Sequence, residues 1–387
     1  MHVAVCGGGN AAHTLMAFLG SRADVQTALY APYRDEAARW QRGVMWRGGI
    51  VAHTAQGLVV GRPDQITNQP EEVIPAADVV ILALPAFAHR VVLEAIAPYL
   101  KAGVWLGAMP ARGGFLWEVE AVLGSRVKDI VVFGLQTLPW ACRIRTFGQD
   151  VDVLGTKHVV DMAIKPPSLA QRLSTYLSDW FNVKIQPVRS FLALGLADVG
   201  QIIHPGIMYG LFRDWDGTPF PEPPLFYQGM DEATAAILDA MSNEVLSIRR
   251  ALEAAYPHLD LSAVRHVGEW IRRTYQGSIR DESSLHCCFV TNESYRGIRA
   301  PVRPVDGGYV PDFQARYLSE DVPFGLLVTR GIAELAGVPT PTIDAVITWA
   351  QEKLGREYLR DGRVAGRDVA ETRAPQRFGH KRLQVES

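Results

Sequence analysis

The sequence predicts an α/β protein in which a Rossmann-type, doubly wound parallel sheet is followed by an all-α domain. Three observations support this: a strand, glycine turn and alanine-rich helix start open the chain, short apolar runs follow, and long apolar helical segments replace them after about residue 190. At 387 residues the chain is long enough for two cores. We expect a dinucleotide-binding domain over residues 1–187 and a helical substrate-binding and catalytic domain over residues 188–387.

The first element is a buried strand that ends at Cys6 and runs into the turn Gly7-Gly8-Gly9-Asn10-Ala11-Ala12. Gly7 permits a tight turn, Gly9 lets backbone N–H groups approach a pyrophosphate, and Ala12 is small enough for the helix to pack on the strand. The loop therefore predicts a dinucleotide site. Its residues are Gly7, Gly9, Asn10, Ala11 and Ala12.

The second strand is expected to end near Tyr30, where a chain that binds NAD(H) normally carries Asp or Glu for the ribose 2′-hydroxyl. Arg34 and Arg39 follow instead. Because a guanidinium pairs well with a phosphate, these residues predict NADP(H) as the cofactor. The alternative is that both are ordinary surface arginines.

Apolar runs at residues 78–85, 104–108 and 130–134 are typical of parallel strands that are covered on both faces. Residues 34–44 have helical character, and residues 49–60 predict a strand pair with a turn at Gln56-Gly57. Ligands bind beyond the carboxyl ends of parallel strands, so we expect Pro85 to lie beside the nicotinamide.

From Phe191 to Phe212 the sequence is so apolar that a membrane span has to be considered. Asp198, His204 and Pro205 argue against a span, so we expect a central helix buried by protein. Amphipathic helices are predicted over residues 231–256 and 261–275 and from residue 338 onward. Residues from about 355 to the end are basic and lack helical periodicity, which predicts a surface tail.

Composition argues against several classes of function. Lys and Arg total 39 against 41 Asp and Glu, a net charge of −2, which offers no field for nucleic acid or anionic lipid. The chain opens directly on a strand, so we expect no signal peptide and a cytoplasmic location. We expect Cys142, Cys287 and Cys288 to be buried small residues, and we predict no metal at His286-Cys287-Cys288 because it lacks partner ligands.

A Rossmann domain holds a cofactor but supplies no substrate site, so the second domain has to contribute a proton donor. His204 lies in an otherwise apolar helix beside Pro205, which can open the backbone locally. A lone buried histidine is more often a core residue, and the pattern alone leaves its role open. The second candidate is a short stretch crowded by Arg316, Glu320 and Asp321, which could equally be a solvated loop.

Together these segments resemble the opine dehydrogenase family, of the octopine and nopaline type. The resemblance covers nearly the whole chain and rests on Gly-Gly-Gly-Asn-Ala-Ala-His at 7–13, Ile-Ile-His-Pro at 202–205, Asn-Glu-Ser-Tyr-Arg-Gly at 292–297 and Arg-Tyr-Leu-Ser-Glu-Asp-Val-Pro at 316–323. Within the family the chain looks most like the bacterial dehydrogenases of opine metallophores such as staphylopine and pseudopaline. Where some relatives carry Asn one turn before the histidine, this chain has Gly200.

The resemblance implies a reductive condensation: an amine condenses with an α-keto acid, water leaves, and the imine accepts hydride from NADPH. It implies that His204 is the general acid and base, that Asp321 pairs with it, and that Arg316 holds a substrate carboxylate. Tyr295 and Tyr209 are candidates for the substrate pocket, although aromatic residues at helical spacing more often belong to a core. Three further candidates of this kind are Asp214, Trp215 and Tyr227.

The resulting prediction is a cytoplasmic, homodimeric, NADPH-dependent opine dehydrogenase that couples pyruvate or 2-oxoglutarate with a nicotianamine-like amine in metallophore biosynthesis. One alternative is an opine dehydrogenase for a simple amino acid, or a ketopantoate-like reductase. Another is a non-catalytic NADP-binding sensor, which is favoured only if His204 and Asp321 lie far apart. The sequence identifies neither the keto acid nor the amine.

Overall fold

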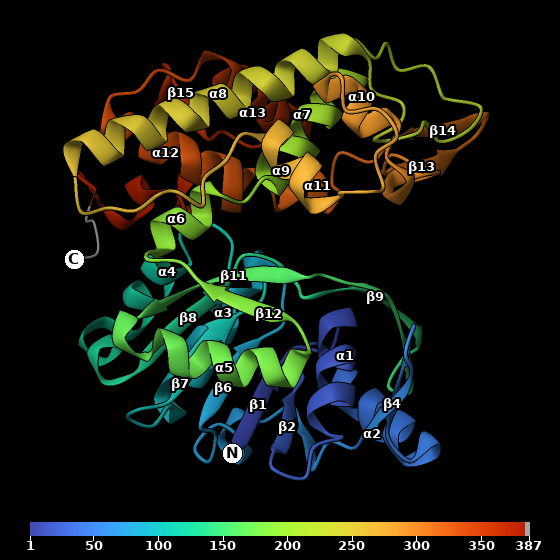
Figure 1. Ribbon diagram of the computed structural model, residues 1–387, viewed down its shortest axis with the longest axis vertical. Helices are drawn as coiled ribbons and strands as arrows, with labels where there is room; N and C mark the ends of the chain where they lie inside the picture. Colours follow the sequence, from blue (N-terminus) through green and yellow to red (C-terminus); the bar gives the residue numbers. More distant parts are fainter. Residues whose placement is uncertain (384–387) are drawn as a thin grey trace. The chain divides into compact units, whose positions relative to one another are not determined.

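The computed structural model describes residues 1–383, which divide into two compact units (Figure 1). Unit 1 spans Met1–Leu194, and unit 2 runs from Gly195 to the end of the described residues. The domain boundary that we expected, after residue 187, lies at the end of strand β12 (Lys184–Pro187) and seven residues before the division between the two units.

Unit 1 is built on an eight-stranded sheet with the order β12-β11-β8-β7-β6-β1-β2-β5. Besides β12, its strands are β1 (His2–Cys6), β2 (Gln26–Tyr30), β5 (Gln65–Thr67), β6 (Val79–Leu82), β7 (Trp105–Ala108), β8 (Val131–Leu135) and β11 (Val159–Lys165). The six strands from β5 to β8 in this order are parallel, and β11 runs antiparallel to β8. The predicted doubly wound α/β class is confirmed.

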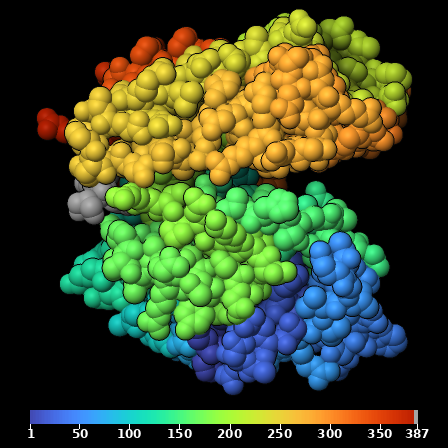
Figure 2. Space-filling view, viewed as in Figure 1, coloured from blue at the N-terminus to red at the C-terminus, as the bar shows by residue number. Residues whose placement is uncertain are grey.

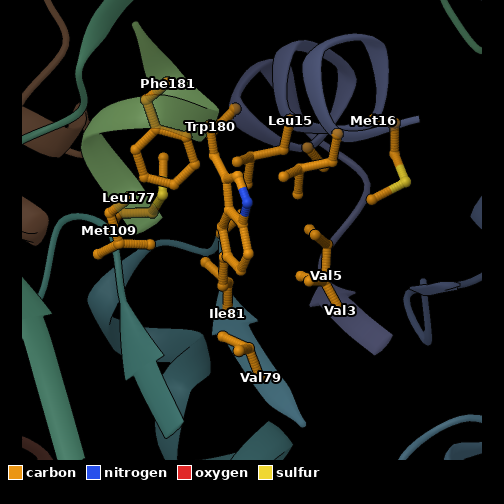
Figure 3. Close-up of a cluster of buried hydrophobic side chains, with 14 of the residues drawn as sticks. Val3, Val5, Leu15, Met16, Val79, Ile81, Met109, Leu177, Trp180 and Phe181 are labelled. Carbon is orange, nitrogen blue, oxygen red and sulfur yellow. The ribbon is translucent and has the colours of Figure 1, made fainter. Parts of the chain in front are cut away.

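The core of unit 1 lies on both faces of this sheet, under the helices α1 (Asn10–Leu19), α2 (Glu36–Arg47), α3 (Ala86–Ile96), α4 (Phe115–Leu123) and α5 (Ala170–Phe181). On one face Leu15 of α1 and Trp180 of α5 pack with Val5 and Ile81 of the sheet (Figure 3). On the other face, α3 and α4 bury Leu93 and Phe115 among side chains of the same strands. Burial on both faces explains why these strands read as continuous apolar runs.

A smaller four-stranded sheet of unit 1 has the order β4-β3-β10-β9. Its strands are β3 (Ile50–Thr54), β4 (Gly57–Gly61), β9 (Trp140–Thr146) and β10 (Asp150–Thr156). The strand pair β3–β4 was predicted from its turn, where Gly57 has a φ of +126° that favours glycine. Its union with β9 and β10 was not predicted, because no local pattern shows which distant strand a hairpin will join.

Unit 2 is mainly helical, as predicted. Its helices are α7 (Gly200–Phe212), α8 (Glu232–Ala255), α9 (Val267–Thr274), α10 (Leu285–Val290), α11 (Arg316–Ser319), α12 (Leu327–Ala336) and α13 (Pro341–Leu354). Helix α8 matches its predicted range, and part of its surface is visible in the space-filling view (Figure 2). Helix α9 is shorter than predicted because it begins after His266, whose side chain accepts the N–H of Gly268 (3.0 Å) as a cap.

Two small hairpins interrupt the helical character expected of unit 2: β13 (Val302–Val305) with β14 (Gly308–Pro311), and β15 (Leu359–Arg360) with β16 (Arg363–Val364). The second hairpin belongs to the segment that we expected to be a surface tail, and that expectation is wrong. Arg373 and Ala374 in this segment are completely buried. Arg330 of α12 also donates to the Gly362 carbonyl between β15 and β16 (2.7 Å). The segment that was expected to be a surface tail therefore belongs to the fold, and it encloses Arg373.

The expected single helix from Phe191 to Phe212 is two helices. Helix α6 (Phe191–Leu196) ends before Asp198, whose carboxylate accepts the N–H of Gly200 (3.0 Å), and α7 begins there. This side-chain bond offers the backbone an alternative to the helical ladder. Within residues 1–383, this stretch alone is long and apolar enough to cross a membrane by length and composition, and 83% of its apolar window is buried inside the protein.

The cysteines differ from expectation at one position. Cys142 and Cys288 are buried as predicted, whereas Cys287 is half-buried. The neighbouring His286 donates its Nε2 proton to the carbonyl of Met230 (3.0 Å), because a carbonyl oxygen can only accept. In the part of the chain that the structure describes, no group of three or more His, Cys, Asp or Glu side chains could hold a metal ion.

Candidate active site

Helix α7 carries His204 and lies unusually close to α8. A side chain at Gly206 would collide with Leu238, and a side chain at Gly210 would collide with Thr234. The two glycines are four residues apart and therefore lie on one face of α7, so the helix backbones can approach without intervening side chains. This packing fixes the helix that positions the imidazole.

The same helix contains Pro205, which has no N–H to donate to the carbonyl of Gln201 one turn earlier. The side chain of Gln201 is nevertheless fixed, because it accepts from Thr329 (2.7 Å) and donates to the Gly195 carbonyl (3.0 Å). A side chain at Gly325 would come within 2.8 Å of the Gln201 Cβ, so the segment after Asp321 also packs tightly on α7.

His204 and Asp321 meet, although 117 residues separate them in the chain. The Nδ1 atom of His204 lies 2.7 Å from a carboxylate oxygen of Asp321. The His204 side chain is 22% exposed, whereas the Asp321 side chain is 3% exposed. Asp321 directly precedes a single π-helical turn, Val322–Leu326, a conformation that often occurs at functional sites. An ionised carboxylate only accepts, so this contact places a proton on Nδ1.

Two tyrosines complete the surroundings of the imidazole. The Nε2 atom of His204 lies 3.2 Å from the hydroxyl oxygen of Tyr227. The ring of Tyr317 stacks on the imidazole, with 4.2 Å between ring centroids and 13° between ring planes. The Tyr317 ring thus covers one face of the imidazole, and both nitrogens of His204 have hydrogen-bond partners within the protein.

Behind this pair lies a cluster of aromatic side chains. Tyr295 stacks on Tyr227 with 3.9 Å between centroids, and Tyr275 contacts Tyr295 edge to face at 4.9 Å. Burial raises the pKa of Tyr227 well above its ordinary value, with a further contribution from Tyr317, and burial does the same to the pKa of Tyr295. Both phenols therefore stay protonated at neutral pH.

In unit 1, the glycine turn lies at the carboxyl end of β1, between β2 and β6. The chain order reverses at this point of the sheet, which is where such folds bind ligands. Gly7 has a φ of +117°, and a side chain there would come within 2.7 Å of Leu84. At Gly9 a side chain would meet nothing within 4 Å, so open space adjoins the backbone there.

Helix α1 begins at Asn10 directly after this open space. Its cap residue is Gly9, which has no side chain to bond the first N–H groups, and its first turn carries no acidic residue. The N–H groups of Asn10, Ala11 and Ala12 can therefore receive a pyrophosphate. The Asn10 side chain itself accepts the N–H of Ile144 (2.8 Å) and so ties the helix to β9. These features fit a dinucleotide.

His13 follows on α1 and has a structural role. Its Nδ1 lies 2.9 Å from the Gly9 carbonyl, and its Nε2 accepts the N–H of Gly148 (2.7 Å). The ring also packs against Trp40, with 4.0 Å between centroids. The pKa of His13 is lowered to about 4, mainly by burial; the Gly9 bond opposes this shift and the Arg39 charge adds to it. His13 thus holds the glycine turn as a neutral imidazole.

Comparison with known proteins shows the family of the chain. Residues 187–354 match the family model described as NAD/NADP octopine/nopaline dehydrogenase, alpha-helical domain. The octopine dehydrogenase of Pecten maximus is 41% identical over 393 residues, which cover 99% of this chain and 98% of that protein. The chain belongs to the opine dehydrogenase family. It is therefore an NAD(P)H-dependent oxidoreductase that reductively couples a keto acid with an amino compound.

Other opine dehydrogenases are also similar. The tauropine dehydrogenase of Arabella iricolor is 37% identical over 388 residues, covering 98% of each chain. A solved octopine dehydrogenase with NADH and L-arginine has a TM-score of 0.91 at 40% identity, covering 99% of this chain and 96% of that one. Yersinopine dehydrogenase with bound NADP⁺ has a TM-score of 0.67 at 15% identity, which shows a common fold alone.

Among the residues predicted to bind substrate in this opine dehydrogenase, Arg316 is already engaged. Its Nε pairs with Glu320, a carboxylate that is completely buried, while the Arg316 side chain is 58% exposed. A guanidinium has five N–H donors in a planar fork, so this pairing still leaves an edge that can bind a carboxylate. Its predicted role as a clamp stays a prediction.

The two tyrosines predicted to bind substrate, Tyr295 and Tyr209, do not contact His204 directly. Tyr295 reaches His204 only through Tyr227, as the outer member of the stack. Tyr209 is five residues after His204, about 140° around the helix axis, and its ring packs edge to face on Trp349 of α13 (5.5 Å). Tyr209 is therefore not brought to His204. Trp215 packs on Phe220 (6.4 Å), in a loop, and is not brought there either.

The residues predicted to choose the cofactor lie beyond the end of β2. Arg34 adopts a φ of +49° and places its guanidinium over Tyr33 (5.0 Å). Arg39 lies on α2 with its guanidinium over Phe147 (3.9 Å). Pro85 caps α3 three residues after the end of β6, and that end pairs in register with Cys6 of β1. Pro85 thus lies at the same edge of the sheet as the glycine turn.

Sequence reasoning missed Glu36, because this residue lies six positions beyond the end of β2 and not at it. A side chain at Gly8 would collide with the Glu36 carboxylate, so an acidic group does adjoin the glycine turn. Burial raises the pKa of Glu36, and the Arg39 charge opposes that effect. Sequence reasoning also left Tyr227 as a minor candidate and did not consider Tyr317. The signal available was the short spacing of Tyr317 from Asp321.

Proposed function

We propose that His204 is the general acid and base of this opine dehydrogenase and that Asp321 is its fixed partner. The observation that carries the proposal is the 2.7 Å contact between His204 Nδ1 and a carboxylate that is almost fully buried. A buried carboxylate orients the imidazole and stabilises its charged form. The alternative of a non-catalytic NADP-binding sensor was favoured only if His204 and Asp321 lie far apart, and they are in contact.

The proposed chemistry begins when an amine adds to the carbonyl carbon of an α-keto acid. His204 moves the proton that converts the hydroxyl of the resulting carbinolamine into water, so that the carbon–nitrogen double bond can form. Bound NAD(P)H supplies the hydride that reduces this bond to a secondary amine. Arg316 is proposed to hold a substrate carboxylate through its exposed edge, which keeps the reacting carbon in place.

The cofactor is proposed to lie on Gly7, Gly9 and the N–H groups of Asn10, Ala11 and Ala12, with Pro85 beside the nicotinamide. For the ribose, two charged groups compete. Arg34 and Arg39 favour NADPH, as the sequence predicted, whereas Glu36 adjoins Gly8 and can accept from a 2′-hydroxyl. We propose NADH as the preferred cofactor, since a carboxylate beside the turn repels a 2′-phosphate. NADPH is the competing outcome.

For the amine we propose a simple amino acid, with pyruvate as the first keto acid to test. Relatives above 35% identity are named octopine, tauropine and opine dehydrogenases, and a solved octopine dehydrogenase carries pyruvate in its name. The nicotianamine-like amine and the metallophore pathway predicted from sequence are the alternative, and the likeness to yersinopine dehydrogenase supports only the fold. A cytoplasmic location and a homodimer are proposed on the sequence alone.

The test is oxidation of NADH and NADPH by the purified protein with pyruvate or 2-oxoglutarate, using single amino acids and a nicotianamine-like amine in parallel. Product formation with an amino acid is expected, and turnover only with the larger amine would contradict our choice. His204→Ala is expected to lower kcat by about 100-fold to 10,000-fold. A variant that keeps its turnover removes the proposed role of His204. Binding of NADH by fluorescence serves as the control for intact folding.

A further inference from the structure

The starting observation is that both ring nitrogens of His204 already have partners in the protein. Nδ1 contacts Asp321 (2.7 Å), and Nε2 contacts the hydroxyl of Tyr227 (3.2 Å). Each imidazole nitrogen has one in-plane position, occupied by either a proton or a lone pair. Nε2 therefore cannot bond to Tyr227 and to a substrate in the same geometry.

Tyr227 is also held in place on several sides. Its ring stacks on Tyr295 with 14° between planes, contacts Phe226 edge to face (4.9 Å), and its hydroxyl is hydrogen-bonded with the side chain of Tyr317. Only 8% of the residue is exposed. A substrate that displaced this phenol from Nε2 would have to separate a packed aromatic stack, which is costly because buried rings lose their contacts.

We infer that Tyr227 is a catalytic residue that carries the proton between His204 and the substrate. This inference rests on the proposed role of His204. In the dehydration step the phenol gives its proton to the departing hydroxyl oxygen of the carbinolamine and takes the Nε2 proton of the charged His204. The carbon–oxygen bond breaks, water leaves, and the lone pair of the amine nitrogen forms the carbon–nitrogen double bond. His204 ends neutral and keeps its proton on Nδ1, where it is hydrogen-bonded to the Asp321 carboxylate.

The surroundings suit such a relay. Burial keeps the pKa of Tyr227 well above its ordinary value, so a free phenolate does not accumulate and the two protons have to move together. The carboxylate of Asp321 stabilises the charged imidazole before the transfer. Asp321, His204 and Tyr227 thus form one continuous line of hydrogen bonds, with Tyr227 at the end opposite Asp321.

The principal test compares Tyr227→Phe with Tyr275→Phe, which removes a hydroxyl from the same aromatic cluster without a contact to His204 in the described contacts. For Tyr227→Phe we expect kcat to fall by about 100-fold, with unchanged NADH affinity. In mixtures of H₂O and D₂O the parent enzyme should show a curved dependence of kcat, which indicates two moving protons, and the variant a linear one. Tyr275→Phe should retain the parent behaviour.

Two outcomes overturn the relay: Tyr227→Phe with kcat close to the parent value, or a curved isotope dependence that survives in the variant. If Tyr227→Phe does not fold, fluorotyrosine at position 227 keeps the ring and hydroxyl while making the phenol more acidic. A kcat that changes with the number of fluorine atoms is expected, and an indifferent kcat contradicts the inference. Nuclear magnetic resonance of ¹⁵N-labelled His204 in the substrate-free protein adds a readout independent of turnover: the Nε2 resonance should shift in Tyr227→Phe and stay in place in Tyr275→Phe.

Failure of the relay and failure of the proposed function give different results. If His204→Ala abolishes turnover while Tyr227→Phe leaves it intact, His204 acts directly on the substrate and only the relay is wrong. If His204→Ala keeps full turnover, the proposed function itself is wrong.

Discussion

Two histidines on helices show how differently the two units use the same side chain. In unit 1, His13 bonds to the backbone of Gly9 and Gly148 and is completely buried. In unit 2, His204 bonds to the Asp321 carboxylate and the Tyr227 hydroxyl and remains partly exposed. Backbone partners fix one neutral tautomer, whereas a carboxylate and a phenol can adapt when the ring gains a proton. The chemistry of the partners therefore separates the structural histidine from the candidate catalytic one.

The largest effect is expected when the carboxylate partner of His204, Asp321, is replaced. Asp321→Asn removes the negative charge that stabilises the imidazolium, so kcat is expected to fall by about 100-fold or more, with little change in NADH affinity. The matched control is Asp239→Asn, which removes a carboxylate from the more exposed pair with His266 (3.3 Å). Steady-state kinetics and fluorescence titration measure both quantities. Unchanged turnover in Asp321→Asn would mean that the charge of Asp321 takes no part in the reaction.

The next effect concerns the pH dependence of stability caused by His13. Its pKa falls from 6.5 to about 4 on folding, so between these values the unfolded chain binds the proton first. Stabilisation by the neutral ring is complete above about pH 6.5 and is lost as the pH falls towards 4, by about 2 kcal/mol at pH 5.

Urea unfolding of the parent and of His13→Gln at pH 7.5 and pH 5 measures this effect. The parent should lose more stability than the variant on acidification. His2→Gln is the control, because His2 is exposed and should behave like the parent. Equal losses in the parent and in His13→Gln would show that the ring does not resist protonation.

A smaller effect tests the packing that positions His204. Gly210→Ala places a methyl group against Thr234 and is expected to destabilise unit 2 by about 1–3 kcal/mol, the usual cost of overpacking. Gly155→Ala is the control, since a side chain at this position meets nothing within 4 Å. Thermal unfolding measures the stability of both variants. If the two are equally stable, α7 does not need its close approach to α8.

The smallest effect is expected at the glycine turn. Glu36→Gln should weaken NADH binding by about tenfold or more, the worth of one charged hydrogen bond, and Arg34→Ala should weaken NADPH binding by a similar factor. Equilibrium titration of each variant with both cofactors gives the ratio. If Glu36→Gln changes neither affinity while Arg34→Ala weakens NADPH alone, the sequence-based choice of NADPH is correct.

The two units also differ in how far their sequence predicts them. The strands of unit 1 and the turn at Gly7 follow from local patterns, because period and turn chemistry act within a few residues. In unit 2, His204 alone matched the pattern of a core residue, and only the family resemblance linked it with Asp321. Their contact depends on how α7 packs on the segment after α11, which no local pattern encodes.

The residues of the candidate site that sequence reasoning missed also depend on contacts between segments distant in the chain. Tyr227 reaches His204 from a loop 23 residues away, and Glu36 reaches Gly8 from the next helix. The carboxyl-terminal segment was misjudged because its arginines suggested solvent, whereas Arg373 is completely buried. Composition reports charge but does not show which charges are enclosed.

The contacts of Arg330 have a practical consequence for this protein. Its guanidinium is 9% exposed and lies between Asp344 of α13, Glu334 of its own helix and the carbonyl of Gly362. Cleavage between α13 and β15 would free the Gly362 carbonyl from an enclosed positive charge, and such a charge is poorly tolerated without its full set of acceptors. Shortening the chain from this end should therefore unfold part of the helical unit, so limited digestion that stops before Tyr358 is expected to yield an inactive protein.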